Sequence, residues 1–170
     1  MITSRSATGT HLRETWPAHV PRALAAKALG PGRMSWLGEP LGIAPHSAGL
    51  DRWAMDLEAD IGGERAHMTL RKAAYVDIGA LTDGGGTGLE VAISWRAASV
   101  APLFPVFAGT VRWLRGELTL EGWYLPVGGS LGAAADQLVF RTVARRTARW
   151  LLRRLAEAMS AQPGQSRSRR

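Results

Sequence analysis

The chain contains no cysteine. It can therefore hold neither a disulfide framework nor a thiolate metal site, and a cysteine nucleophile is excluded with them. No apolar run reaches the roughly 18 residues that a membrane-spanning helix needs, and residues 1–6 lack the apolar stretch of a signal peptide. These absences predict a cytoplasmic protein without a membrane span. At 170 residues, the chain is long enough for one domain with a core of its own.

Lysine is scarce, and the formal charge of +7 is placed unevenly along the chain. Residues 131–170 carry nine arginines against Asp136 and Glu157, whereas residues 1–130 hold equal numbers of basic and acidic residues. An arginine-rich helix face is most often a solvated face, although an anionic partner would also suit it. The face lacks interleaved aromatic residues and the chain has no recognised nucleic-acid motif, so no nucleic-acid partner is expected.

Alternation of apolar and polar residues predicts antiparallel strands with one buried and one solvated face. The predicted buried positions are Trp53, Met55, Leu57 and Ile61, then Met68, Leu70, Ala74, Val76 and Ile78, then Leu89, Val91, Ile93 and Trp95, then Val111 and Trp113, and last Leu118, Leu120 and Tyr124. Lys72 interrupts its apolar face and is expected to snorkel. Turns at Gly62-Gly63 and at 83–86 make these strands a meander.

The rest of the chain shows other patterns. A first strand is expected over 11–16, a short helix over 21–29, and a loop over 30–49, where glycine and proline are frequent. Apolar residues spaced by three and four predict one long helix over 131–159, about 43 Å long at 1.5 Å per residue. Its predicted sheet-facing residues are Leu138, Val139, Val143, Trp150, Leu151 and Leu155, and its opposite face carries Arg141, Arg145, Arg149 and Arg153.

These boundaries predict a single domain over 8–160 and a disordered basic tail over 161–170. The tail contains no apolar residue beyond Ala161, so it has nothing to bury that would offset the entropy of ordering it.

A resemblance to a known family is carried by Trp95, the segment Leu103-Phe104-Pro105, the pattern Leu118-x-Leu120-x-Gly122-x-Tyr124-x-Pro126, and Gly128, Gly132 and Asp136 ahead of the long helix. Over roughly residues 50–160 the chain resembles the SRPBCC superfamily, more narrowly its uncharacterised bacterial members. This helix-grip group includes START lipid-transfer domains and polyketide cyclases and dehydrases. The chain departs from similar sequences at Val127, where they tend to have a second proline.

The resemblance implies an α+β fold in which an antiparallel sheet curves around a long C-terminal helix, with an apolar cavity between them. It implies no particular reaction. The motifs that carry it are structural, not catalytic.

One stretch matches a catalytic motif. Residues 128–132 read Gly-Gly-Ser-Leu-Gly, the G-x-S-x-G pattern of a nucleophile elbow. A hydrolase of that kind needs an acid and a histidine after the serine, and a parallel sheet. All four histidines lie upstream, and the strands are predicted to be antiparallel. The interpretation is a strand-to-helix turn with Ser130 near the helix N-cap.

Two further motifs have ordinary structural interpretations. The glycine run at 83–88 leads into a predicted strand, whereas a phosphate loop must open a helix. The carboxylates of Asp51, Asp56, Glu58 and Asp60 alternate along one strand, with His67 near them in sequence; this is typical of a solvated face, not of convergent metal ligands. The sequence therefore predicts no catalytic residue, no metal and no cofactor, and it leaves open whether the protein is an enzyme.

The leading hypothesis is that a hydrophobic small molecule or lipid binds between the sheet and the long helix. Inner-face aromatic residues would line the cavity, two phenylalanines in a connection would cap one end, and the helix would close it. The predicted ligand-binding residues are Trp53, Trp95, Phe104, Phe107, Trp113, Tyr124, Val139 and Val143. Such residues equally form an ordinary core.

Two alternatives stay open. One is a polyketide cyclase or dehydrase-like enzyme on the same fold, for which Tyr124 is the reasonable proton donor. The other is a module that binds a surface through its arginine-rich helix.

Overall fold

A computed structural model describes residues 9–30, 39–43, 50–63, 66–83, 86, 88–98, 106–125 and 133–161. In chain order the elements are β1 (Thr10–Pro17), α1 (Arg22–Leu29), β2 (Glu39–Ile43), β3 (Asp51–Gly63), β4 (Ala66–Asp83), β5 (Leu89–Ala97), β6 (Val106–Leu114), β7 (Glu117–Leu125) and α2 (Ala133–Ser160). Within this described part of the chain, no helix is long and apolar enough to cross a membrane. Apart from Ala161, the predicted basic tail lies outside the described residues.

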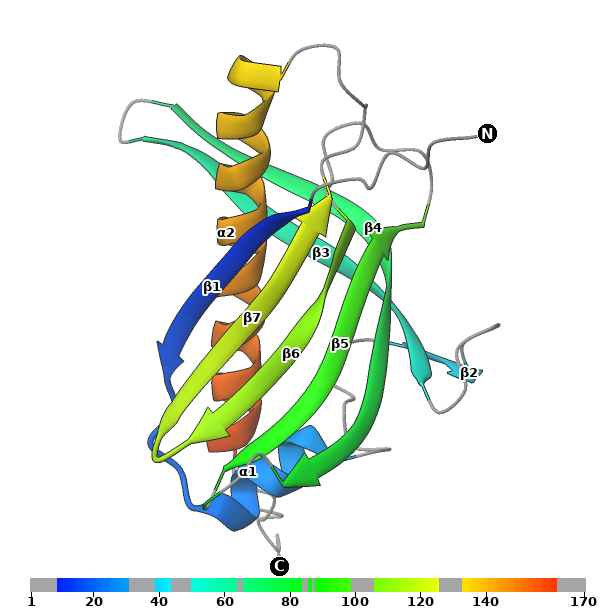
Figure 1. Ribbon diagram of the computed structural model, residues 1–170, viewed down its shortest axis with the longest axis vertical. Coiled ribbons are helices and arrows are strands. Elements are labelled where there is room, and N and C mark those ends of the chain that lie inside the picture. The colour runs from blue at the N-terminus through cyan, green and yellow to red at the C-terminus, as the bar shows by residue number, and fades with distance from the viewer. Residues whose placement is uncertain are drawn as a thin grey trace, which may run out of the picture.

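The strands form one seven-stranded sheet in the order β1-β7-β6-β5-β4-β3-β2, and every neighbouring pair is antiparallel. Strands β3 to β7 follow one another as a meander, and the N-terminal strand β1 returns to pair with the last strand, β7. Figure 1 shows the strands curving in front of α2, with α1 near the C-terminal end of that helix. The predicted α+β architecture and the predicted meander are confirmed.

The face of the sheet that turns toward α2 is the one that alternation predicted. In β5 the residues Leu89, Val91, Ile93 and Trp95 are buried, and the residues between them are more exposed. The same alternation holds in β6 and β7. Because successive side chains of a strand point to opposite faces, one apolar set from each strand builds a continuous core surface.

The long helix α2 makes its close backbone approaches to β1, β7 and β3, which are strands from the two flanks of the curved sheet. Its buried residues recur every three or four positions: Phe140, Val143, Ala144, Thr147, Ala148, Leu151, Leu152, Leu155, Ala156 and Met159. The predicted sheet-facing positions Val143, Leu151 and Leu155 are therefore confirmed as buried, and Trp150 is half-buried. The side chains of Leu138 and Val139 lie outside the described residues.

Two sequence-based expectations about the connections are wrong. The segment 30–49, predicted to be loop, contains the strand β2, which pairs with the start of β3 through a register shift between Pro40 and Gly42. An edge strand tolerates proline because its missing N–H is not needed by a second neighbour. Gly62-Gly63, predicted to be a turn, still belongs to β3 and pairs with Ala66 and His67 of β4.

Phe107 also lies elsewhere than predicted. Instead of capping the interior from a connection, it is fully buried within β6 and pairs with Trp95 and Tyr124 on the neighbouring strands. Ala108 and Gly109, which follow it, have low strand propensity, so alternation alone did not extend the strand to Phe107. Pairing on both sides with β5 and β7 overrides that local preference.

The core packing of α2 can be tested with a buried charge. Val143 is fully buried on the face of α2 that contacts the sheet, so we expect Val143→Asp to lower the free energy of unfolding by about 3–5 kcal/mol. The matched control is Arg141→Asp, which places the same side chain on the exposed face of the same helix. Urea unfolding followed by circular dichroism measures both variants. Equal stability losses in the two would contradict this packing.

Candidate functional site

A row of buried side chains crosses the inner face of the sheet at one level. Register pairs Trp53 with Val76, Val76 with Trp95, Trp95 with Phe107, and Phe107 with Tyr124. Directly paired residues on neighbouring strands project from the same face, so these five residues form one band from β3 to β7, called here the inner-face row. All five are buried. Alternation predicted the faces of four of these residues, but only the register aligned all five.

The centre of the inner-face row is a stacked aromatic pair. The rings of Trp95 and Phe107 lie with centroids 4.1 Å apart and planes inclined by 17°. Stacked rings at this distance attract each other beyond the burial of their area, by about 0.5–1.5 kcal/mol. The pair therefore forms a flat apolar unit on the inner face of the sheet.

Two glycines make room for this arrangement. Gly109 on β6 pairs directly with Gly122 on β7, and each occupies the inner face two residues from a row position. A Cβ atom on Gly109 would lie 2.2 Å from the carbonyl oxygen of Glu121 and 2.8 Å from the tip of the Phe107 ring. A Cβ on Gly122 would meet the same ring at 2.7 Å. The Phe107 ring thus lies over a patch of bare backbone that only glycine allows.

The interior contains two buried polar groups that have no hydrogen-bond partner among the described residues: the indole N–H of Trp95 and the hydroxyl of Thr147. Trp95 belongs to the inner-face row, and Thr147 belongs to the buried stripe of α2. Buried polar groups in folded proteins are nearly always hydrogen-bonded, because an unmet donor costs about 1–3 kcal/mol. Within the described part of the chain, the N–H of Trp95 and the O–H of Thr147 thus have unused hydrogen-bonding capacity among mostly apolar neighbours.

Trp113 behaves differently. It pairs with Leu89 and Leu118, toward the far end of its strand from Phe107, and its indole N–H donates to the carbonyl oxygen of Ala18 at 3.1 Å. This bond ties β6 to the segment that follows β1. The N–H of Trp113 is thus already occupied, in contrast to that of Trp95.

A carboxylate that the sequence analysis did not single out lies on the inner side of β1. Glu14 is only 5% exposed and accepts hydrogen bonds from the Nε atoms of Arg145, at 2.5 Å, and Arg149, at 2.7 Å. The alternation of Leu12, Glu14 and Trp16 along β1 was the signal that could have found it. Two of the four arginines predicted to face away from the sheet therefore hold α2 to the edge strand.

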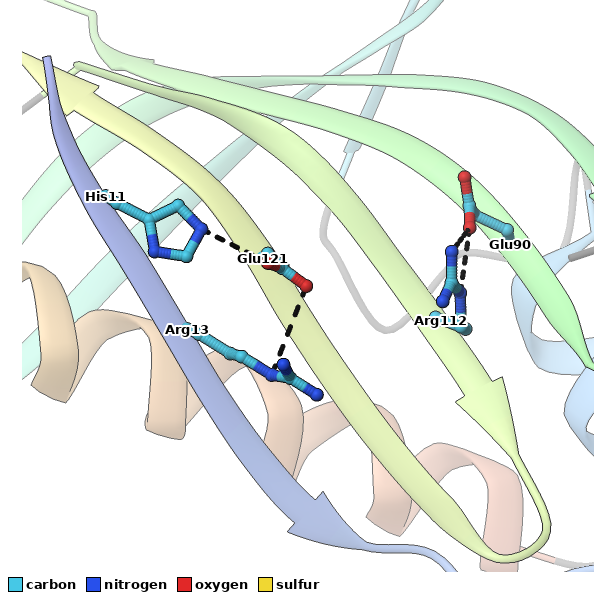
Figure 2. A network of polar contacts seen from close by, with 5 residues as sticks. All are labelled: His11, Arg13, Glu90, Arg112 and Glu121. Atoms are coloured by element: carbon cyan, nitrogen blue, oxygen red, sulfur yellow. Dashed lines mark hydrogen bonds and ion pairs between the residues drawn. The ribbon is translucent and has the colours of Figure 1, made fainter.

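The outer face of the sheet carries ion pairs between neighbouring strands. Figure 2 shows Glu121 of β7 between His11 and Arg13 of β1, and Arg112 of β6 bonded to Glu90 of β5. These side chains lie on the side of the sheet away from α2. They are half-exposed or more exposed groups except for Glu90, so each pair contributes at most about 1 kcal/mol.

The acidic residues on β3 follow the same pattern. Asp56 and Glu58 both lie near the guanidinium of Arg71 on β4. Asp77, by contrast, is mostly buried and accepts two bonds from Arg52 at 2.7 and 2.8 Å. The hydrogen bonds to Asp77 raise the pKa of Arg52 above its ordinary value.

The structure brings together four of the predicted ligand-binding residues, Trp53, Trp95, Phe107 and Tyr124, in the inner-face row. Val143 lies on the buried stripe of α2, and Trp113 lies farther along β6. Phe104, the side chain of Val139 and the G-x-S-x-G segment with Ser130 lie outside the described residues. Their roles stay predictions, as does ligand binding by the whole set.

No family model matches the chain, and no curated protein matches it. Solved structures do resemble it. The Zhui aromatase/cyclase from Streptomyces sp. R1128 superposes with a TM-score of 0.55 at 14% identity, over 89% of this chain and 94% of the other. The di-domain ARO/CYC BexL from the BE-7585A biosynthetic pathway gives a TM-score of 0.57 at 13% identity, over 94% of this chain and 53% of the other.

Identities this low establish a shared fold and nothing finer. The shared fold is the helix-grip fold, in which an antiparallel sheet curves around a C-terminal helix. The helix-grip fold that the sequence around Trp95 and Tyr124 predicted is thereby confirmed.

The glycine pair beneath Phe107 can be tested directly. In Gly109→Ala the new Cβ would press on the carbonyl oxygen of Glu121, which is backbone and cannot rotate away, so we expect a loss of about 2–4 kcal/mol of unfolding free energy. Near-ultraviolet circular dichroism should change as the Trp95–Phe107 stack is displaced. The control is Gly9→Ala, where the nearest atom would lie at an ordinary 3.4 Å. A Gly109→Ala variant as stable as this control would refute the argument.

The ion pairs of Glu14 predict a second effect on stability. Removing both guanidiniums in Arg145→Ala/Arg149→Ala leaves a buried carboxylate without its donors, so we expect a loss of about 1–3 kcal/mol. The matched control, Arg141→Ala/Arg153→Ala, removes the same charge from the same helix at exposed positions.

Thermal melts of both double variants, repeated in a Glu14→Gln background, separate pairing from net charge. In that background the stability loss caused by Arg145→Ala/Arg149→Ala should shrink, because the buried carboxylate is gone. The stability loss caused by the control double variant should not change. If Arg145→Ala/Arg149→Ala lowered stability equally in both backgrounds, the ion pairs with Glu14 would contribute nothing to stability.

Proposed function

We propose that this protein binds a hydrophobic small molecule between the sheet and α2, against the inner-face row. The supporting observation is the indole N–H of Trp95, which has no hydrogen-bond partner among the described residues although Trp95 is only 2% exposed. A ligand with an acceptor oxygen would satisfy this donor, and the stacked Trp95–Phe107 surface would bury its apolar body. Ligand sites commonly combine apolar aromatic walls with a few such polar groups.

The physical mechanism is desolvation with one or two orienting bonds. Burial of apolar ligand surface contributes about 25 cal/mol for each Å² removed from water. The Trp95 N–H would donate to a carbonyl or hydroxyl oxygen of the ligand, and the Thr147 hydroxyl could donate or accept. Since both groups are fixed on opposite walls, one on β5 and one on α2, they would set the direction in which the ligand lies.

An enzyme of the aromatase/cyclase kind is the second candidate, because two solved structures that superpose with TM-scores above 0.5 carry that description. The polar groups that the described interior offers it are Trp95, Thr147, Tyr124 and Glu14. Glu14 is held by two arginines at the edge of the sheet. A reaction here would therefore rely on positioning a flexible substrate, with Tyr124 as the proton donor, and not on an acid–base pair of carboxylates.

Binding can be tested with prodan, a neutral fluorescent naphthyl ketone that has one carbonyl acceptor and an apolar body. Trp95→Phe keeps an aromatic ring and removes the N–H, so we expect prodan to bind about five- to tenfold more weakly, the value of one hydrogen bond. Trp113→Phe is the matched control. The N–H of Trp113 already donates to the carbonyl oxygen of Ala18. Removing this N–H should therefore lower stability and leave the prodan affinity within about twofold.

Native mass spectrometry of the purified protein complements this titration, since a co-purified hydrophobic molecule would identify the ligand class, lipid or otherwise. Equal weakening in the Trp95 and Trp113 variants would show that the free N–H plays no part. If wild-type protein takes up neither prodan nor a co-purified ligand, the interior is a packed core alone.

A further inference from the structure

A concave site lies on the flank where β1 meets α2. It is a groove of about 220 Å³ lined by Trp16, Arg146, Arg149, Trp150 and Arg153. Trp16 comes from the end of β1, and the other four residues come from the C-terminal half of α2. Residues three and four apart share a helix face, so three guanidiniums and one indole of α2 converge on the indole of the neighbouring strand.

The two indoles give the groove apolar walls. Trp16 and Trp150 are both half-buried and pack against the core on one side. The guanidinium of Arg154 lies 5.7 Å from the centre of the Trp150 ring, within the range of a cation–π contact. Such contacts hold an indole in place while leaving part of its surface open to a ligand. Neither ring belongs to the inner-face row.

The charge of the groove and its margins is strongly positive. Residues 145–160 of α2 include five arginines and one acid, Glu157. The Nε atom of Arg149 donates to the carboxylate of Glu14 on β1 at 2.7 Å, which holds this guanidinium in position. Glu157 lies 3.9 Å from Arg153, and both side chains are at least half exposed, so this pair is weak. The five arginines outnumber Glu14 and Glu157, so the formal charge beside the two indole rings is positive.

We propose that this groove binds an aromatic carboxylate. Guanidinium groups bond carboxylate oxygens in a planar, paired geometry, and the indoles would stack against the aromatic body of the ligand. The volume falls below the roughly 300 Å³ at which drug-sized pockets begin, so the groove suits a ligand of one or two rings. The site is independent of the interior, where the proposed ligand is neutral.

The experiment uses 2-naphthoate, with neutral 2-naphthol as its matched probe. Isothermal titration measures affinity in wild type, in Arg153→Gln and in Arg141→Gln. Arg153 lines the groove, whereas Arg141 is an exposed arginine of the same helix outside it. We expect naphthoate to bind about fivefold more weakly or worse to Arg153→Gln, unchanged to Arg141→Gln, and more weakly as salt rises.

The location is read from the indole N–H signals in nitrogen-proton correlation spectra, assigned with Trp16→Phe, Trp150→Phe, Trp95→Phe and Trp113→Phe. Naphthoate should shift the signals of Trp16 and Trp150 and leave those of Trp95 and Trp113 in place. Shifts confined to Trp95 would place the anion in the interior and overturn this proposal while supporting the interior site. Equal affinity in the two arginine variants, or tighter binding of naphthol than of naphthoate, would also overturn it.

Discussion

Burial of one face of α2 against the concave side of the sheet is the interaction on which the rest of this structure depends. The helix is 28 residues long and approaches the flanking strands β1, β7 and β3 closely. A sheet can reach a single helix with both flanks only if it curves. Two irregularities in strand pairing accompany the curvature: a register shift in β4 between Ile78 and Leu81, and another where β2 pairs with β3. Such irregularities bend a strand and increase its twist.

Curvature in turn decides what lies between the helix and the middle of the sheet. The central strands β5 and β6 approach α2 less closely than β1, β3 and β7 do, and their largest side chains, Trp95 and Phe107, are buried on the inner face. The glycine pair Gly109–Gly122 lets the Phe107 ring lie close to the backbone of β6 and β7. The layer is consequently aromatic and apolar, and the unused donor of Trp95 stands out against it.

The two sides of α2 serve different chemistry. Its buried stripe completes the apolar interior, and its arginine-rich side does more than keep the helix in water. Arg145 and Arg149 neutralise Glu14 on the edge strand, so β1 is held to the helix by charge as well as by apolar contact. Arg149 also lines the groove between Trp16 and Trp150, together with Arg146 and Arg153. An apolar interior and a cationic exterior groove can thus coexist on one helix without sharing a side chain.

The sequence by itself determined the elements whose pattern is local. Alternation located β3, β4, β5 and β7 and identified their buried faces, and the spacing of Val143, Leu151 and Leu155 identified the buried stripe of α2. A first strand was expected where β1 lies, but its buried face was not predicted. Side-chain period is a property of the backbone of each element, so one chain segment suffices to read it. The predictions that failed concern segments whose structure depends on pairing with other strands. The strand β2 pairs with the edge of β3, and Phe107 belongs to a strand because β6 pairs with β5 and β7.

Only the tertiary structure decided the sites. The inner-face row depends on the register of five strands, which no single segment encodes. The free N–H of Trp95 and the occupied one of Trp113 look alike in sequence and differ only because Ala18 lies beside one of them. Glu14 meets its arginines across more than 130 positions of the chain, and Trp16 meets Trp150 across a similar interval. Contacts between distant segments are set by packing of the whole chain, and local pattern carries no record of them.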